Sequence, residues 1–316
     1  MISRRGFLAT SSAALLSATE IKSARAQVPT EIRIGYQKNG VLVVAREQAA
    51  LEKHFAPRGI TVSWFDFPAG PPLLEAMNAG SVDFGQVGDT PPIFAQAGGA
   101  KIVYVAGQSI TNGQGILVKP DGAIRTLADL KGKRIGFTKG SSAQNVVVMA
   151  LEKTGLQYSD ITPVYLSPPD GAAAFARDSI DAWAVWDPYF AIGEVRSGGR
   201  VLAKASDVGK ANSFYIANRD FAAHSPQLVS AVIDVLAKSA GWAETHRDQV
   251  GQLMAKVTGV DADIQTLAAQ RSAFAIGKLT DDLIATQQAV ADRFFRLGLI
   301  PRQIAVREVV WVANQS

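Results

Sequence analysis

A short polar segment, Lys139-Gly-Ser-Ser-Ala-Gln-Asn145, holds the residue types best suited to bind a small anion. It lies between an apolar run that predicts a strand and a run that predicts a helix. The first turn of a helix has backbone N–H groups without intrahelical partners and a partial positive charge. Ser141 and Ser142 add hydroxyls, and Asn145 adds a side-chain amide one turn later. The segment predicts an anion site made of hydrogen-bond donors, although serine here also serves as a helix cap without any ligand.

The chemistry of such a site favours a fully ionised oxyanion. A sulfonate carries one diffuse negative charge and no proton near neutral pH, so it requires donors only. Sulfate and nitrate have the same requirement, whereas a phosphate site more naturally includes an acceptor for the proton that the ligand retains. These residue types therefore favour sulfonate, sulfate or nitrate over phosphate.

Other polar candidates follow the ends of other predicted strands. Gly88-Asp-Thr-Pro-Pro92 ends one strand and begins a helix with proline in its first turn. Asp89 or Thr90 can cap that helix, and their backbone N–H groups can also face a ligand; the two roles are compatible. Gln37, just beyond the first strand, has an amide that could reach the same anion.

An apolar cluster accompanies the polar candidates. Aromatic residues at strand ends are more often core than ligand contacts. Trp186 is the exception that we single out, because it precedes Asp187 at a strand end and would suit an alkyl or aryl tail. The cluster comprises Trp183, Trp186, Pro188, Tyr189 and Phe214.

The elements that position these residues alternate between apolar strands and amphipathic helices, which predicts an α/β fold with a mostly parallel sheet. One helix is expected over 41–55, and the chain beyond about residue 226 is expected to be mainly helical. The predicted strands are 31–36, 61–67, 82–87, 102–105, 115–118, 134–138, 161–166, 181–185, 201–203 and 213–217.

An internal repeat divides this pattern into two halves. Residues 75–89 read EAMNAGSVDFGQVGD and residues 174–187 read AFARDSIDAWAVWD, so Asp89 corresponds to Asp187. Ligands of open α/β sheets bind beyond the carboxyl ends of strands. Two similar lobes that face each other would place both aspartates at one shared cleft, which closes by hinge motion.

Composition excludes several classes of protein. The formal charge of the 316 residues is +4, but residues 1–26 contribute +3 of it, so the remainder has no basic footprint for nucleic acid or anionic lipid. The absence of cysteine excludes disulfides, thiolate metal sites and cysteine nucleophiles. No cofactor and no metal are expected.

The first 26 residues predict a signal peptide, and so a periplasmic protein. Ser3-Arg-Arg-Gly-Phe-Leu8 is followed by a short apolar run and then by the small-x-small cleavage signal Ala24-Arg-Ala26. The arginine pair indicates the twin-arginine route, with a general secretory signal as the alternative. The apolar run is too short to span a bilayer of about 30 Å.

At these residues the chain resembles the aliphatic sulfonate-binding proteins of ABC importers. The similarity runs over residues 30–312. Its matching segments are Ile34-Gly-Tyr-Gln-Lys38, Phe67-Pro-Ala-Gly-Pro71, Gly88 to Ala97, Lys139-Gly-Ser-Ser142 with Asn145, Asp181 to Tyr189, and Ser213-Phe-Tyr215.

The resemblance implies a two-lobed, type II periplasmic-binding fold with crossovers near Val118 and Ala217. The first lobe would hold residues 27–118 and the second 119–214, with 215–316 returning to the first. It also implies a monomer that delivers an alkanesulfonate to an inner-membrane permease driven by a cytoplasmic ATPase. The implied ligand contacts are Gln37, Asp89, Thr90, Ser141, Ser142, Asn145, Trp186 and Asp187, while 108–115 would shape the tail pocket.

Three alternatives remain open at this point. Desulfinases of the same architecture use a cysteine, which this chain lacks, and His54, His224 and His246 lie away from the cleft motifs. A ligand-sensing domain of a transcription regulator would need a DNA-binding module and no leader. Within the binding-protein class, taurine, aryl sulfonates and nitrate are the alternatives, and a taurine site would use Asp89 or Asp187 for the amine.

Overall fold

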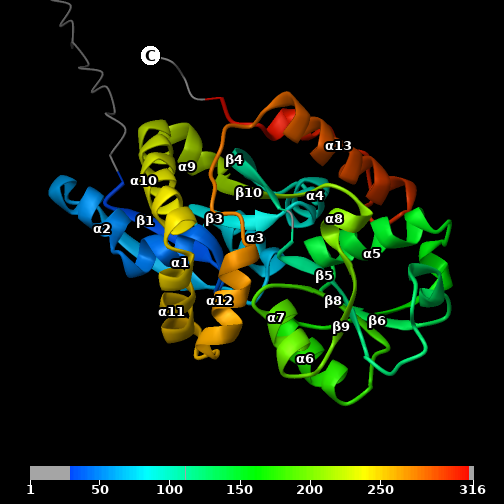
Figure 1. The fold of residues 1–316 in the computed structure, drawn as a ribbon. Helices are drawn as coiled ribbons and strands as arrows, with labels where there is room; N and C mark the ends of the chain where they lie inside the picture. Colours follow the sequence, from blue (N-terminus) through cyan, green and yellow to red (C-terminus); the bar gives the residue numbers. More distant parts are fainter. Residues whose placement is uncertain (1–28, 111, 313–316) are drawn as a thin grey trace, which may run out of the picture.

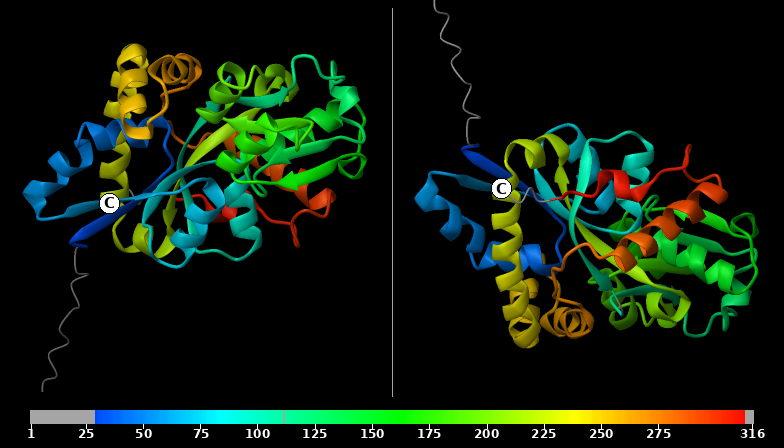
Figure 2. Two further views of the ribbon diagram at one scale, coloured as in Figure 1. Left: turned by 90° about the horizontal axis from the view of Figure 1, so that it is seen from below. Right: turned by 90° about the horizontal axis from the view of Figure 1, so that it is seen from above.

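A computed structural model describes residues 29–110 and 112–312, so the predicted signal peptide lies outside the described residues. The alternating pattern folds into two lobes, each built on a five-stranded sheet with helices packed against it (Figure 1). The two lobes lie side by side in both further views (Figure 2).

The sheet of the first lobe has the strand order β2-β1-β3-β10-β4. The strand β1 pairs in parallel with β2 and β3, and β10 pairs antiparallel with β3 and β4. Its strands are β1 (Glu31–Tyr36), β2 (Thr61–Asp66), β3 (Phe84–Gly88), β4 (Ile102–Ile110) and β10 (Ala211–Asn218).

The sheet of the second lobe repeats this arrangement with the order β7-β6-β8-β5-β9. Here β6 pairs in parallel with β7 and β8, while β5 is antiparallel to β8 and β9. Its strands are β5 (Gln114–Val118), β6 (Arg134–Phe137), β7 (Thr162–Tyr165), β8 (Ala182–Trp186) and β9 (Arg200–Lys204).

The predicted crossovers near Val118 and Ala217 are wrong. The chain leaves the first sheet after Ile110 and enters the second at Gln114; it returns to the first sheet at Ala211. The reason is that each strand after a crossover pairs with the sheet that the chain has just entered. The strand β5 lies between β8 and β9 of the second sheet, and β10 lies between β3 and β4 of the first. The strand 114–118 therefore belongs to the second lobe, and 211–214 belongs to the first.

The internal repeat is confirmed by the same ion pair in both lobes. Arg33 of β1 donates from Nη2 to Oδ1 of Asp83 at 2.6 Å, and Arg134 of β6 donates from Nη2 to Oδ1 of Asp181 at 2.8 Å. In each case the backbone N–H of the arginine also donates to the other carboxylate oxygen, Oδ2. The repeated aspartate thus links the strand that follows it to the neighbouring parallel strand of its own sheet, β1 in the first lobe and β6 in the second.

Helices cover the faces of both sheets, and the predicted helix 41–55 is two helices because Ala49 adopts φ 48° between them. The helices are α1 (Gly40–Glu47), α2 (Ala50–Phe55), α3 (Gly70–Asn78), α4 (Thr90–Ala97), α5 (Ser142–Lys153), α6 (Pro168–Ala176), α7 (Tyr189–Val195), α8 (Ala205–Val208), α9 (Arg219–His224), α10 (Pro226–Thr245), α11 (Arg247–Thr258), α12 (Ala262–Arg271) and α13 (Asp281–Arg296). Short 3-10 turns are η1 (Ala56–Arg58), η2 (Leu127–Leu130), η3 (Tyr158–Asp160) and η4 (Val306–Val309).

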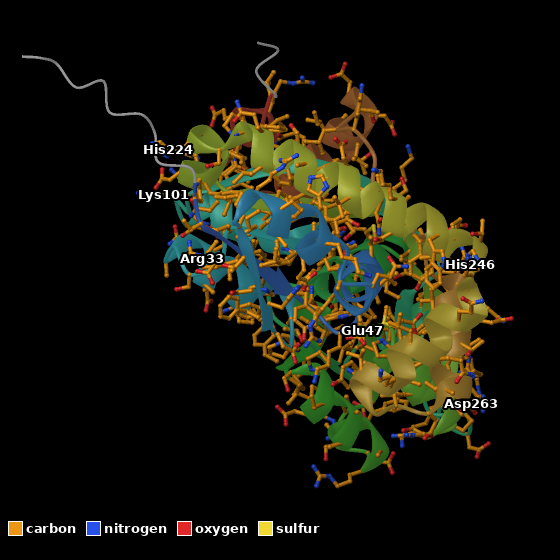
Figure 3. The ribbon with its side chains drawn as sticks, turned by 90° about the vertical axis from the view of Figure 1, so that its left-hand side faces the viewer. Arg33, Glu47, Lys101, His224, His246 and Asp263 are labelled. Atoms are coloured by element: carbon orange, nitrogen blue, oxygen red, sulfur yellow. The ribbon has the colours of Figure 1, made fainter. Side chains whose placement is uncertain are left out.

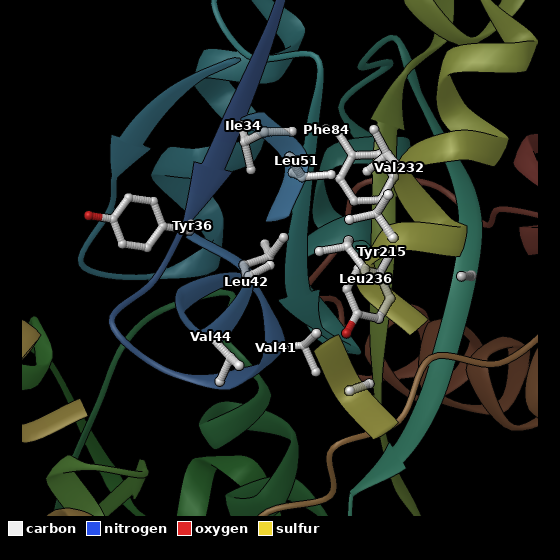
Figure 4. Packing of buried hydrophobic residues seen from close by; sticks show 14 of the residues in the cluster. Ile34, Tyr36, Val41, Leu42, Val44, Leu51, Phe84, Tyr215, Val232 and Leu236 are labelled. Carbon is white, nitrogen blue, oxygen red and sulfur yellow. The ribbon is translucent and has the colours of Figure 1, made fainter. Parts of the chain in front are cut away.

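The helical C-terminal part packs on the first lobe, as predicted. The long helix α10 lies against α1 and α2, and its Val232 and Leu236 join Ile34, Phe84 and Tyr215 in a buried cluster (Figure 4). The helix α13 contacts α4 and η4 (Figure 1). Its Arg293 donates to Glu152 of α5 in the second lobe. Among the described residues, no helix is long and apolar enough to cross a membrane.

Candidate ligand-binding site

A cavity of about 110 Å³ lies where the two lobes meet. It is smaller than the roughly 300–1,000 Å³ of sites for drug-sized ligands, so it suits a small molecule. Side-chain amides and hydroxyls supply most of its polar lining. These are Gln37, Asn39, Gln86, Gln108, Gln114, Ser141, Ser142, Ser213 and Ser272.

Three helices begin at this cavity. The first residues of α1, α3 and α5 are Gly40, Gly70 and Ser142, and all three line it. The first two helices belong to the first lobe and the third to the second lobe. The starts of α1 and α5 contribute unpaired N–H groups and a partial positive charge, whereas Pro71 and Pro72 leave the first turn of α3 with the N–H groups of Gly70 and Leu73. The predicted anion-binding end of α5 is therefore joined by two helix starts that we did not predict as ligand contacts.

The two serines at the start of α5 have different roles. Ser141 donates its hydroxyl to the carbonyl of Thr138 at 2.6 Å, so this side chain closes the turn before the helix. Ser142 faces the end of β3, where a Cβ added to Gly88 would lie 2.8 Å from the Ser142 hydroxyl oxygen. Only glycine at position 88 lets the two lobes approach this closely.

Gln37, a predicted ligand contact, lines the cavity and belongs to a hydrogen-bonded set in the first lobe. Its amide donates to the carbonyl of Gln86 at 3.3 Å, and the Gln86 amide donates to the hydroxyl of Ser213 at 3.2 Å. Ser213 in turn donates to the carbonyl of Val87 at 2.8 Å. These bonds fix the polar wall formed by β3 and β10.

Asp89, Thr90 and Asn145 do not line the cavity, and their contact with a ligand stays a prediction. The Asn145 amide donates to the Asp89 carboxylate at 2.8 Å, and the Thr90 hydroxyl donates to the other carboxylate oxygen at 2.8 Å. Asp89 is 1 % exposed and Asn145 is fully buried. All three residues lie at the boundary between the lobes, as the sequence predicts, but their polar side-chain atoms hydrogen-bond to one another.

This cluster continues into the C-terminal helix. Arg293 of α13 donates to the side-chain oxygen of Asn145 at 3.2 Å and to the carboxylate of Glu152 at 2.7 Å. Burial raises the pKa of Asp89 to about 6, although the hydrogen bonds from Thr90 and Asn145 favour its charged form. The cluster joins β3, α5 and α13, and we call Asp89, Asn145 and Arg293 the interlobe cluster.

Asp187 borders the cavity, but its carboxylate is held by an arginine that we did not predict. Arg271, at the end of α12, donates to both Asp187 oxygens at 2.7 Å and to Glu194 at 2.6 Å. The helix α12 packs beside α11 of the first lobe and contacts α7 of the second. The pair Asp187–Arg271 is thus a second link between the lobes, and the backbone carbonyl of Asp187 also accepts from Asn39 at 3.1 Å.

These placements leave a cavity without net charge from side chains. Among the described residues, the one ionisable side chain in the lining is Asp187, and Arg271 neutralises it. The field of the three helix starts then remains, and it favours a monoanion. Trp186 lines the same cavity and lies opposite Gln114 where β8 pairs with β5.

The geometry offers no sign of catalytic machinery in the part of the chain that is described. Within residues 29–110 and 112–312, no group of three or more acidic or histidine side chains could hold a metal ion. Figure 3 shows His224 and His246 on the outside of the molecule, and none of the three histidines lines the cavity.

Comparison with known proteins agrees with this architecture. A family profile described as NMT1/THI5 like matches residues 48–250. A putative aliphatic sulfonates-binding protein of Escherichia coli (strain K12) is 39% identical over 306 residues, covering 96% of this chain and 95% of that protein. The chain belongs to the NMT1/THI5-like family.

Two further relatives support the same fold and extent. A putative aliphatic sulfonates-binding protein of Bacillus subtilis (strain 168) is 32% identical and covers 89% of this chain and 85% of its own length. The solved structure of the alkanesulfonate-binding protein SsuA from Xanthomonas axonopodis pv. citri, bound to MOPS, matches with a TM-score of 0.84 and 39% identity. That match covers 90% of this chain and 98% of the other. The predicted two-lobed periplasmic-binding fold is thereby confirmed.

Proposed function

We propose that this family member is the exported solute-binding component of an ABC importer and that it takes small aliphatic sulfonates. The observation that carries the proposal is the meeting of three helix starts at an uncharged, amide-lined cavity. A sulfonate needs several donors and no acceptor, which is what helix starts provide. The 39% identity to a sulfonate-binding relative supports this ligand class.

The division of donors between the lobes gives a mechanism. The starts of α1 and α3 belong to the first lobe and the start of α5 to the second, so one anion contacts all three only when the lobes are closed. A ligand shifts a conformational equilibrium by the difference between its affinities for the two states. Sulfonate binding would therefore favour the closed form, which is the form that a permease in the inner membrane would recognise in the periplasm.

An enzymatic role has no support from the site. The relatives that share 32–39% identity with this chain are described as binding proteins. The chain has no cysteine to act as a desulfinase nucleophile. We accordingly assign binding and delivery, in the monomeric state, as the function of the mature chain.

Thermal unfolding with a panel of anions tests the proposal. Each anion is added at about 1 mM, which is well above the dissociation constant of a ligand that binds in the micromolar range. The panel comprises ethanesulfonate, butanesulfonate, octanesulfonate, taurine, benzenesulfonate, sulfate and nitrate. We expect the shorter alkanesulfonates to raise the Tm most, because the cavity is small. Stabilisation by nitrate or sulfate with no response to any sulfonate would refute the assignment.

A further inference from the structure

Two glutamines flank the first crossover between the lobes, and neither is satisfied by the protein. Gln108 lies near the end of β4, Gln114 begins β5, and both line the cavity. Within residues 29–110 and 112–312, Oε1 of Gln108 and Nε2 of Gln114 are buried and have no hydrogen-bond partner. Gln114 as a whole is 1 % exposed. Buried polar atoms normally have a partner, so these two indicate a group that the ligand brings.

The register of the strands places the Gln108 amide away from the start of α5. Ser213 of β10 lies opposite both Gly88 of β3 and Gln108 of β4, so the three residues form a row across the first sheet. Directly opposed residues project to the same face, and neighbouring strands lie about 4.8 Å apart. Gln108 is therefore two strands, or about 10 Å, from Gly88, which abuts Ser142.

The second lobe contributes the other amide to the cavity lining. Gln114 lies opposite Trp186 in the pairing of β5 with β8, and both side chains line the cavity. An anion held at the start of α5 would direct its tail toward the Trp186 indole and the two amides. The tail end of the cavity is thus partly polar.

We propose that Gln108 and Gln114 recognise a hydroxyl group on the tail, so that the preferred ligands are short hydroxyalkanesulfonates. This proposal rests on the function proposed above. A hydroxyl is both a donor and an acceptor, so it can donate to Oε1 of Gln108 and accept from Nε2 of Gln114. A methyl group satisfies neither atom. An ammonium group has no acceptor for Gln114, and the lining carboxylate, Asp187, is already held by Arg271.

Calorimetric titration with two ligands of similar size tests the idea on the unmodified mature protein. 2-Hydroxyethanesulfonate and propane-1-sulfonate differ by a hydroxyl in place of a methyl group. We expect the hydroxylated ligand to bind about 10-fold more tightly, since it pairs two buried polar atoms, and we expect taurine to bind more weakly than either. Equal affinities, or a preference for propane-1-sulfonate or taurine, would overturn the proposal.

Variants assign the preference to the two amides. Gln108→Met and Gln114→Met keep the length of the side chain and remove its hydrogen bonds, and each is expected to reduce the ratio of the two affinities to below about threefold. Gln227→Met, on the exposed side of α10, is the matched control and should keep the full ratio. A ratio unchanged in both cavity variants would contradict the assignment.

The two proposals fail in different ways. If no sulfonate binds the unmodified protein, the proposed function itself is wrong. If propane-1-sulfonate binds but the hydroxyl brings no gain, the function stands and only the role of the two glutamines is lost. A methionine variant that does not unfold cooperatively is replaced by the leucine variant at the same position, Gln108→Leu or Gln114→Leu. The comparison of the two ligands on the unmodified protein tests the preference for a hydroxyl without any variant.

Discussion

The Asp89 carboxylate, at the end of β3, accepts a hydrogen bond of 2.8 Å from the Asn145 amide of α5, so two buried side chains from different lobes meet directly. The corresponding aspartate of the repeat is Asp187 in the second lobe. Its carboxylate accepts hydrogen bonds from Arg271 of α12, which packs beside α11 of the first lobe. The repeated aspartates therefore hold the lobes together from two sides of the cavity. We expect them to act on closure and not through contact with the ligand.

Protonation of Asp89 should make stability depend on pH. Its pKa rises from the ordinary 3.8 to about 6 in the folded protein, so the folded state binds this proton more tightly than the unfolded state does. The stabilisation is complete below about pH 3.8 and is lost as pH rises through 6. Relative to Asp89→Asn, which is neutral throughout, the wild type should lose up to about 3 kcal/mol of unfolding free energy between pH 4 and pH 7.

Urea unfolding of both proteins across this range measures the difference, and other titrating groups cancel between them. A difference that stays constant from pH 4 to pH 7 would show that burial does not shift this carboxyl.

Loss of Arg271 should destabilise the protein more than loss of the whole ion pair. Arg271→Met leaves the Asp187 carboxylate buried without its partner, and an unpaired buried charge costs about 3–5 kcal/mol. The double variant Asp187→Asn/Arg271→Met removes both charges and should recover part of that loss. Chemical denaturation of the two single variants and the double variant measures the coupling. Strictly additive losses would mean that the two residues do not act as a pair.

Alanine variants of Ser141 and Ser142 should have different effects, one on the stability of the protein and the other on its affinity for sulfonates. Ser141→Ala removes the hydrogen bond to the Thr138 carbonyl and is expected to cost about 1 kcal/mol of stability with little change in sulfonate affinity. Ser142→Ala removes a cavity hydroxyl and should weaken sulfonates of every tail length about 10-fold. Titration and thermal unfolding of both variants distinguish the roles. The reverse pattern would place the anion nearer Ser141.

Gly88→Ala should block closure while leaving both lobes folded. The added Cβ would lie 2.7 Å from the Cβ of Ser142 in the other lobe, a separation that requires the lobes to move apart. We expect sulfonate affinity to fall at least about 10-fold, with the unliganded Tm changed little. Small-angle scattering should then show no compaction on adding ligand. A variant that compacts normally would show that this contact does not limit closure.

Much of the fold could be predicted because strand and helix periodicity is local. The strand over 31–36 and the helical C-terminal region were predicted correctly, and the repeat 75–89 with 174–187 was sufficient to infer two lobes. The local sequence could not show to which sheet β5 and β10 belong, because each strand pairs with segments far from it in the sequence. The crossovers were misplaced for that reason.

Chain position was enough to predict several residues that border the cavity. Gln37, Ser141, Ser142, Trp186 and Asp187 lie at or next to the ends of elements that meet there, and all five line it, while their contact with a ligand stays a prediction. The starts of α1 and α3 could have been found by applying to Gly40 and Gly70 the reasoning applied to α5. The pairing of Asp187 with Arg271, and of Asn145 with Arg293, could not be predicted, because both arginines lie more than 80 residues from their partners on helices whose docking only the tertiary structure defines.

All strands of the second sheet come from one continuous segment, 114–204, whereas the first sheet needs β10 to fill the place between β3 and β4. A chain made from its N-terminus therefore has every strand of the second lobe before it has the last strand of the first. The first lobe stays open along two strand edges until residue 218 is available. The first sheet can therefore be completed only after the whole of the second-lobe segment and the start of the C-terminal third have been made.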